Sequence, residues 1–153
     1  MKNLLILSTL LTLCSCATAL IPKDQRKLVF TEETKLSKND AYVNSLSFIA
    51  KNFGNSNEVI KAQDKDSGLL IIKGNTDCNI FKQFGDVNNY LLQFTLELNH
   101  KDNKVKMSFE DLFISSSTGE AVGWDYNQLT DKDKINKAGE CLSSLKKGLV
   151  SNE

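Results

Sequence analysis

The sequence predicts an α+β fold in which a single antiparallel sheet of about five strands carries two helices on one face. Apolar and polar residues alternate over residues 90–99 and 105–110, which is typical of strands with one buried face. Residues 38–53 and 130–149 repeat apolar residues at helical spacing instead. Short polar connections between the strand-like segments favour hairpins, so the expected order is β-α-β-β-β-β-α.

The first strand and helix are predicted from residue type and capping. Residues 27–33 contain a β-branched and aromatic run that suits a strand. Ser37 is a good N-cap, Asp40 follows in the first turn, and Gly54 suits the end of the helix. The sequence therefore predicts a strand followed by a helix over residues 38–53.

Two hairpins should follow. Residues 64–68 have the short polar side chains and glycine of a tight turn, so residues 58–63 and 69–74 are expected to pair. Residues 100–103 are predicted to turn the chain between the two longer strands, which leaves His100 exposed in that turn. The alternation slips at residues 111–114, where a bulge or the end of the strand is expected.

The last third is predicted to be a long connection followed by a helix. Residues 115–128 are rich in Ser and Gly and contain Trp124 and Tyr126. The helix should open at Thr130, with acidic residues in its first turn, and run to Leu149, with Gly148 near its end. Trp124 and Tyr126 either form a binding loop or pack Trp124 onto the core, and the second alternative is favoured.

The amino terminus resembles a bacterial lipoprotein signal. Residues 1–15 combine an early lysine with an apolar run too short to span a membrane. Ser15 is the small residue that a signal peptidase needs before the cut, so Cys16 is the expected lipid-attachment cysteine. The alternative is an ordinary secretory cut near Ala17 or Ala19. We expect residues 16–26 to form a tether and residues 27–150 to form a single α+β domain.

The balance of charged residues argues against a nucleic-acid partner. The chain has 19 basic and 19 acidic side chains, and removal of Lys2 with the signal leaves 18 against 19. This balance gives no bulk attraction to nucleic acid. In an exported protein Cys78 and Cys141 could form a disulfide, or they could be two separate buried thiols, and both alternatives stay open.

A set of short motifs resembles a known family: Leu28-Val29-Phe30-Thr31, Leu36-Ser37-Lys38 leading to Tyr42, Asn52-Phe53, Val59-Ile60 up to Asp64, Ser67-Gly68 and Lys73-Gly74. The family is an uncharacterised group of exported bacterial proteins, described as a domain of unknown function with a TBP-like fold. The likeness covers residues 28–114 and implies a curved antiparallel sheet with helices on one side. It brings no catalytic residues, and a shared fold does not transfer DNA binding.

The sequence contains no pattern that predicts catalysis or metal binding. His100 is the only histidine, and one histidine with two distant cysteines does not make a zinc pattern. Residues 64–68 lack the glycine position and closing glutamate of an EF-hand loop. Glu110 and Asp111, being adjacent on a strand, are expected to point to opposite faces. We therefore expect no catalytic residues, no metal and no cofactor.

The function itself is not named by the residues. We expect a non-enzymatic, lipid-anchored binding or interaction module of the bacterial cell envelope, facing the periplasm at the outer membrane and holding a protein partner. Its contact surface would be the wet face of the sheet or the Trp124 loop. The alternative is a proteinaceous inhibitor of a secreted or periplasmic enzyme.

Overall fold

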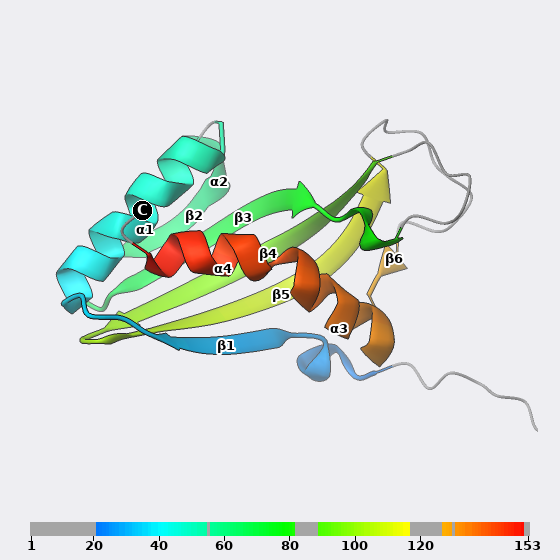
Figure 1. Cartoon of the computed structure of the whole chain (residues 1–153), viewed down its shortest axis with the longest axis horizontal. Coiled ribbons are helices and arrows are strands. Elements are labelled where there is room, and N and C mark those ends of the chain that lie inside the picture. Colours follow the sequence, from blue (N-terminus) through cyan, green and yellow to red (C-terminus); the bar gives the residue numbers. More distant parts are fainter. Residues whose placement is uncertain (1–20, 55, 82–88, 117–126, 130, 152–153) are drawn as a thin grey trace, which may run out of the picture.

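The structure is a computed structural model that describes residues 21–54, 56–81, 89–116, 127–129 and 131–151. Its elements run in the following order: η1 (Lys23–Gln25), β1 (Leu28–Glu33), α1 (Lys38–Asn52), α2 (Ser56–Val59), β2 (Ile60–Asp64), β3 (Leu69–Asp77), η2 (Asn79–Phe81), β4 (Tyr90–Lys101), β5 (Lys104–Ser116), β6 (Asn127–Gln128), α3 (Lys132–Cys141) and α4 (Ser143–Val150). The strands form one sheet in the order β1-β5-β4-β3-β2, with β6 beside β5 (Figure 1). Every pairing is antiparallel, as the hairpin connections predict.

The β4–β5 hairpin is the centre of the sheet. Apolar side chains on alternate residues of both strands are buried, and Leu96 lies opposite Phe109 while Leu98 lies opposite Met107. The turn between the strands is short, and Asn103 takes a positive φ of 59° that asparagine tolerates better than most residues. The predicted strands are confirmed, although both are longer than the alternation alone indicates.

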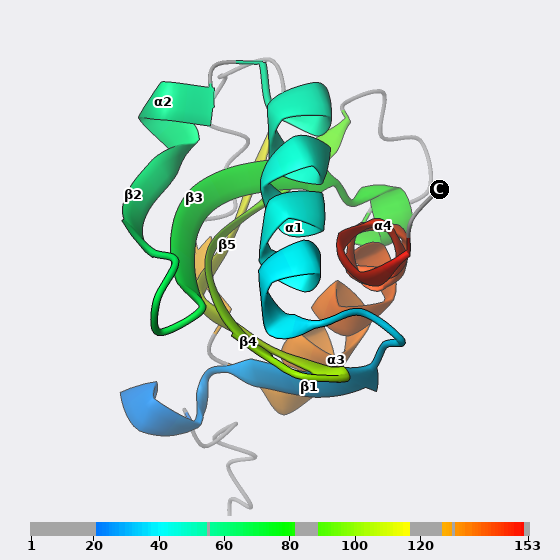
Figure 2. The same cartoon turned by 90° about the vertical axis from the view of Figure 1, so that its left-hand side faces the viewer.

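Helix α1 begins where the sequence predicts. The Ser37 side chain accepts a hydrogen bond from the Asp40 backbone amide at 3.2 Å, which satisfies one of the free donors of the first turn. The buried residues of this helix, Ala41, Tyr42, Ser45 and Ile49, face the sheet. Figure 2 shows the sheet curving around α1 and α4, so that both helices lie on one face. The predicted α+β class and the two-layer arrangement are therefore confirmed.

The carboxy-terminal helix differs from the prediction, because it is two helices. Asp131 is the N-cap of α3 and accepts hydrogen bonds from the amides of Asp133 and Lys134. Helix α3 ends and α4 begins at Leu142. At this junction the Ser143 hydroxyl donates a hydrogen bond to the Glu140 carbonyl at 2.7 Å. Such local side-chain bonds compete with the helical ladder, and the apolar spacing cannot show them.

Gly148 lies inside α4 rather than at its end. A Cβ atom built at this position would overlap the ring of Phe48 on α1, so the glycine permits the two helices to approach closely.

The predicted connection over residues 115–128 is also shorter than expected. Strand β5 continues to Ser116, and β6 pairs with it through Gln128 and Asn127.

Candidate binding surface

The two faces of the sheet have different environments. Helices α1, α3 and α4 all lie against one face of the sheet, and the hydrophobic core lies between these helices and the sheet. We call the opposite face the open face. It includes these side chains from four strands: Val29, Thr31 and Glu33 on β1; Lys104, Lys106, Ser108, Glu110 and Phe113 on β5; Gln93, Thr95, Glu97, Asn99 and Lys101 on β4; Leu69, Ile71, Lys73 and Asn75 on β3.

A β-bulge interrupts the open face on β5. Gln93 of β4 lies opposite Phe113, but Thr95, two residues on, lies opposite Glu110, so β5 contains one extra residue. Asp111 takes a left-handed backbone conformation with φ 49°. The slip that the sequence shows at residues 111–114 is therefore a bulge and not the end of the strand.

The bulge corrects one expectation about side-chain direction. Phe109 and Leu112 are both buried, while Glu110 and Asp111 between them are both exposed. Adjacent residues of a regular strand would point to opposite faces. The extra residue makes the two carboxylates neighbours on the surface and returns Leu112 to the core.

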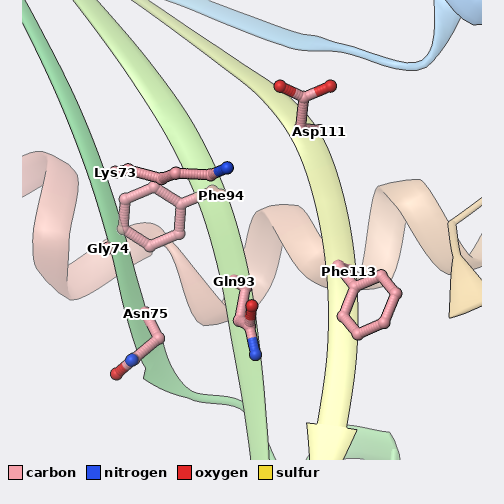
Figure 3. A pocket seen from close by; sticks show the side chains of 7 residues that line it. All are labelled: Lys73, Gly74, Asn75, Gln93, Phe94, Asp111 and Phe113. Atoms are coloured by element: carbon pink, nitrogen blue, oxygen red, sulfur yellow. The ribbon is translucent and has the colours of Figure 1, made fainter. Parts of the chain in front are cut away.

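Beside the bulge the open face is hollowed. The hollow has a volume of about 370 Å³ and is lined by Lys73, Gly74, Asn75, Gln93, Phe94, Asp111 and Phe113, and we call it the bulge hollow (Figure 3). Its labelled side chains come from three neighbouring strands, β3, β4 and β5. The lining combines an ammonium group, two primary amides, a carboxylate and two aromatic rings, of which that of Phe94 is buried. It can therefore donate and accept hydrogen bonds and offer the Phe113 ring as an apolar surface to a ligand.

Two hydrogen bonds fix the polar groups of the bulge hollow. The Thr95 hydroxyl donates to the Asp111 carboxylate at 3.1 Å. The Gln93 amide donates to the Ser115 hydroxyl at 3.0 Å. Both pairs join β4 to β5 across the bulge, so the side chains that border the hollow are held by neighbours on a rigid element.

A second hollow of about 190 Å³ lies on the other side of Asp111. It is lined by residues from the start of the described chain and from the bulge: Lys23, Asp24, Arg26, Lys27, Glu110, Asp111 and Leu112. Arg26 also donates to the Ile21 carbonyl at 2.6 Å. The segment that precedes β1 therefore lies next to the bulge and supplies basic side chains close to its two carboxylates.

His100 does not lie in an exposed turn, contrary to the sequence prediction. It is 1% exposed, because β4 continues to Lys101 and the even-numbered residues of this strand all face the core. Its Nδ1 lies 2.8 Å from the Gly68 carbonyl and its Nε2 lies 2.9 Å from the Ser45 hydroxyl. Burial lowers the pKa of His100, and the Gly68 hydrogen bond opposes this shift.

The turn over residues 64–68 is confirmed as the turn of a hairpin. Strands β2 and β3 pair on either side of it, and the Asp64 carboxylate accepts hydrogen bonds from the amides of Asp66 and Ser67. Hydrogen bonds from the side chain and backbone of Ser67 lower the pKa of Asp64. Across the described residues no group of three His, Cys, Asp or Glu side chains is placed to hold a metal ion.

Cys78 and Cys141 are joined in a disulfide, with 5.3 Å between their Cα atoms. Cys78 follows β3, and Cys141 is the last residue of α3, so the bond fastens the carboxy-terminal helices to one end of the sheet.

Cys16, Trp124 and Tyr126 lie outside the described residues. None of the helices in the described part of the chain has the length and apolar character needed to cross a membrane.

Sequence reasoning missed the residues of the bulge hollow as a group. Lys73, Asn75 and Gln93 are ordinary polar residues on the wet faces of their strands, and no sequence spacing connects them. The only sequence signal for the bulge hollow is the interrupted alternation of apolar and polar residues near Asp111. Register, which depends on pairing between distant strands, brings these side chains together.

The comparisons with known proteins agree with this architecture. The profile of the family described as "Domain of unknown function (DUF4468) with TBP-like fold" matches residues 31–114. The fold is similar to the crystal structure of a DUF4468 family protein from Bacteroides ovatus, with 14% identity, a TM-score of 0.51 and 82% of each chain covered. It is also similar to a TBP-like protein from Parabacteroides distasonis, with 12% identity and a TM-score of 0.51, covering 86% of this chain and 98% of that one.

At these identities the solved structures show the fold alone. No curated protein matches the chain. The family profile covers more than half of the sequence, from the second half of β1 through α1, β2, β3 and β4 to near the end of β5. The resemblance expected from the short motifs is thus confirmed for the family and the fold. The chain belongs to the DUF4468 family of domains of unknown function with a TBP-like fold.

Proposed function

We propose that the protein is a non-enzymatic binding module, anchored in the bacterial cell envelope through lipid on Cys16, which holds its partner on the open face at the bulge hollow. The observation that carries this proposal is the bulge at Asp111. A left-handed conformation is unfavourable for a residue with a side chain, although aspartate tolerates it better than most. Bulges that re-aim a side chain are over-represented at functional sites.

The rest of the open face supports the same proposal. Helices α1, α3 and α4 lie on the other face of the sheet, and the bulge hollow offers donors, acceptors and the Phe113 ring side by side. The only histidine of the sequence is buried beneath α1 with both ring nitrogens engaged, so it cannot reach a ligand bound on the open face. This arrangement favours recognition over acid–base catalysis.

The binding surface can be tested by photo-crosslinking in cells. A photoreactive phenylalanine analogue at Asn75, in the bulge hollow, should form a discrete adduct. The same analogue at Val43, which is 55% exposed on α1, should not form it. Asp111→Ala should weaken the Asn75 adduct. Equal adducts at both positions, or none at Asn75, would remove the open face as the binding surface.

The loop version of the proposal has a separate test. A variant with Trp124→Ala and Tyr126→Ala should leave the Asn75 adduct unchanged if the partner rests on the bulge hollow alone. If the double change abolishes the adduct and the fold is retained, the loop that carries these aromatics is the principal contact instead.

The anchor is tested by intact mass of the membrane-extracted protein. A diacylglyceryl-sized addition that is lost in Cys16→Ala would support the anchor. A mass that starts near Ala17 or Ala19 without lipid would show a soluble secreted protein, and the anchored part of the proposal would be abandoned while the binding surface would still stand on the crosslinking result.

A further inference from the structure

A third hollow lies on the open face at the opposite end of the sheet from the bulge. It has a volume of about 420 Å³ and is lined by Thr31, Asn99, Lys101, Lys104 and Lys106, and we call it the lysine hollow. Its residues come from three adjacent strands. Lys106 lies opposite both Thr31 of β1 and Asn99 of β4, and Lys104 lies opposite Lys101 across the tip of the β4–β5 hairpin.

The register concentrates positive charge in this hollow. Residues directly opposite on an antiparallel pair have Cβ atoms about 5 Å apart, and like charges in that position are destabilising. Lys101 and Lys104 are such a pair, and Lys106 follows two residues later on the same face of β5. All three side chains are exposed. The fold therefore places three ammonium groups around one depression.

Two carboxylates lie near the cluster and offset part of its charge. Glu33 lies opposite Lys104 on β1, and Glu97 lies in the next row of the open face. Glu97 accepts a hydrogen bond from the Asn99 amide at 2.7 Å. Within the ranges that the structure describes, neither carboxylate forms an ion pair with Lys101, Lys104 or Lys106. The three ammonium groups therefore outnumber the two nearby carboxylates and are not held by an ion pair with either of them.

We propose that the lysine hollow binds a phosphate-type dianion carried by a soluble ligand. Lysine ammonium groups are compact point charges that suit a tetrahedral anion approached from several sides, whereas planar carboxylates are matched best by the arginine fork, which this hollow lacks. The Thr31 hydroxyl is a neutral donor within the same lining. The inference deepens the proposed function and rests on it, because it names the ligand chemistry at one end of the same face.

The position of the hollow favours a soluble ligand over the surface of the membrane. Strand β1 separates the lysine hollow from the start of the described chain, with η1 at one end and the hairpin tip at the other (Figure 1). The six residues of β1 span about 20 Å. The described chain begins at Ile21, near the bulge end of β1, so the lysines lie at the other end of the open face from the point where the proposed anchor segment joins the domain.

The test is a titration of the full mature chain with inorganic phosphate, in which NMR amide chemical shifts are recorded at constant ionic strength. A parallel titration with sodium chloride is the reference. Saturable shifts should centre on Thr31, Asn99 and the β4–β5 hairpin tip. Lys104→Gln should weaken the affinity by about tenfold, because one charge-assisted contact is lost. The triple change of Lys101, Lys104 and Lys106 to Gln should abolish saturation.

The control is the triple change of Lys132, Lys134 and Lys137 to Gln on α3, which removes the same charge from exposed positions outside the hollow. Phosphate affinity should be unchanged in this control. Equal weakening by both triple variants would show a bulk charge effect and would overturn the proposal. The melting temperature of the hollow triple should stay close to that of wild type, since the Lys101–Lys104 repulsion and the Glu33–Lys104 attraction are removed together. Lost binding then cannot be ascribed to lost folding.

Vesicles separate the two sources of phosphate. Sedimentation with phosphatidylglycerol vesicles, without saturable binding of inorganic phosphate, would assign the lysines to a membrane surface and overturn the proposal. The Asn75 crosslink tells the two proposals apart. If the hollow triple keeps the Asn75 adduct while wild type fails to bind phosphate, the lysine hollow is refuted and the bulge hollow remains the binding surface.

Discussion

The Ser45 hydroxyl lies 2.9 Å from Nε2 of His100, and both residues are buried. The same hydroxyl lies 3.2 Å from the Leu149 carbonyl on α4, and the other ring nitrogen of His100 lies 2.8 Å from the Gly68 carbonyl. This chain of hydrogen bonds connects α1, β4, the β2–β3 turn and α4. This buried hydrogen-bond network lies inside a mainly apolar core, and it connects α1 and α4 to the sheet.

The buried histidine predicts acid sensitivity. Burial lowers the pKa of His100 below its unfolded value of 6.5, so the unfolded chain binds a proton that the folded chain rejects. The stabilisation is complete above pH 6.5 and is lost as the pH falls from there toward the folded pKa, by at most about 1.4 kcal/mol per pH unit. Urea unfolding between about pH 5 and about pH 8 measures this slope. His100→Asn should remove it, and an unchanged slope would assign the acid sensitivity to other groups.

The disulfide predicts a large loss of stability on reduction. Cys78 and Cys141 are 63 residues apart, and a cross-link that closes a loop of this length restricts the unfolded chain by about 4 kcal/mol in the chain-entropy description. The variant with both cysteines changed to Ala should lose stability of this order in denaturant unfolding. Reductant should lower the stability of wild type and leave the double variant unaffected. If reductant destabilises both proteins alike, the loss does not come from this bond.

Two helical glycines should respond to alanine with opposite signs. Gly148→Ala would drive a methyl group into the Phe48 ring and should cost about 1–3 kcal/mol by overpacking the α1–α4 contact. At Gly139 a Cβ atom would meet Leu28 at an ordinary 3.6 Å, so Gly139→Ala should stabilise α3 by up to about 1 kcal/mol. Thermal unfolding of the two variants compares them directly. A stabilising Gly148→Ala would mean that α1 and α4 are not packed as closely as the structure shows.

The bulge predicts an order among substitutions of Asp111. Glycine adopts φ 49° without penalty, whereas alanine in the left-handed region costs about 1–2 kcal/mol. Asp111→Gly should therefore be more stable than Asp111→Ala, although both lose the hydrogen bond from Thr95. Asp111→Asn should lie near wild type. Chemical denaturation gives this order, and equal stability of the Gly and Ala variants would argue against a left-handed residue at this position.

Much of the fold could be predicted because its elements leave local signals. The alternation along β4 and β5, the Ser37 cap and the polar turn at residues 64–68 all report the conformation of neighbouring residues. The prediction of an exposed turn at His100 is wrong, because its polarity and its neighbours suggest a turn whereas the period of the strand continues through it. A histidine can be buried when distant partners satisfy both ring nitrogens, and those partners, Ser45 and Gly68, are 55 and 32 residues away.

The α+β class, the hairpins and the family can be predicted from the residues alone, since these depend on periodicity, turn chemistry and short motifs along the chain. The pairing register, and with it the bulge hollow, the lysine hollow and the burial of His100, becomes visible only in the folded chain. The physical reason is that strand pairing brings together side chains from β1, β3, β4 and β5 that no local pattern relates. A one-residue change in the register of any one of these strands would move the side chains of that strand to the other face of the sheet.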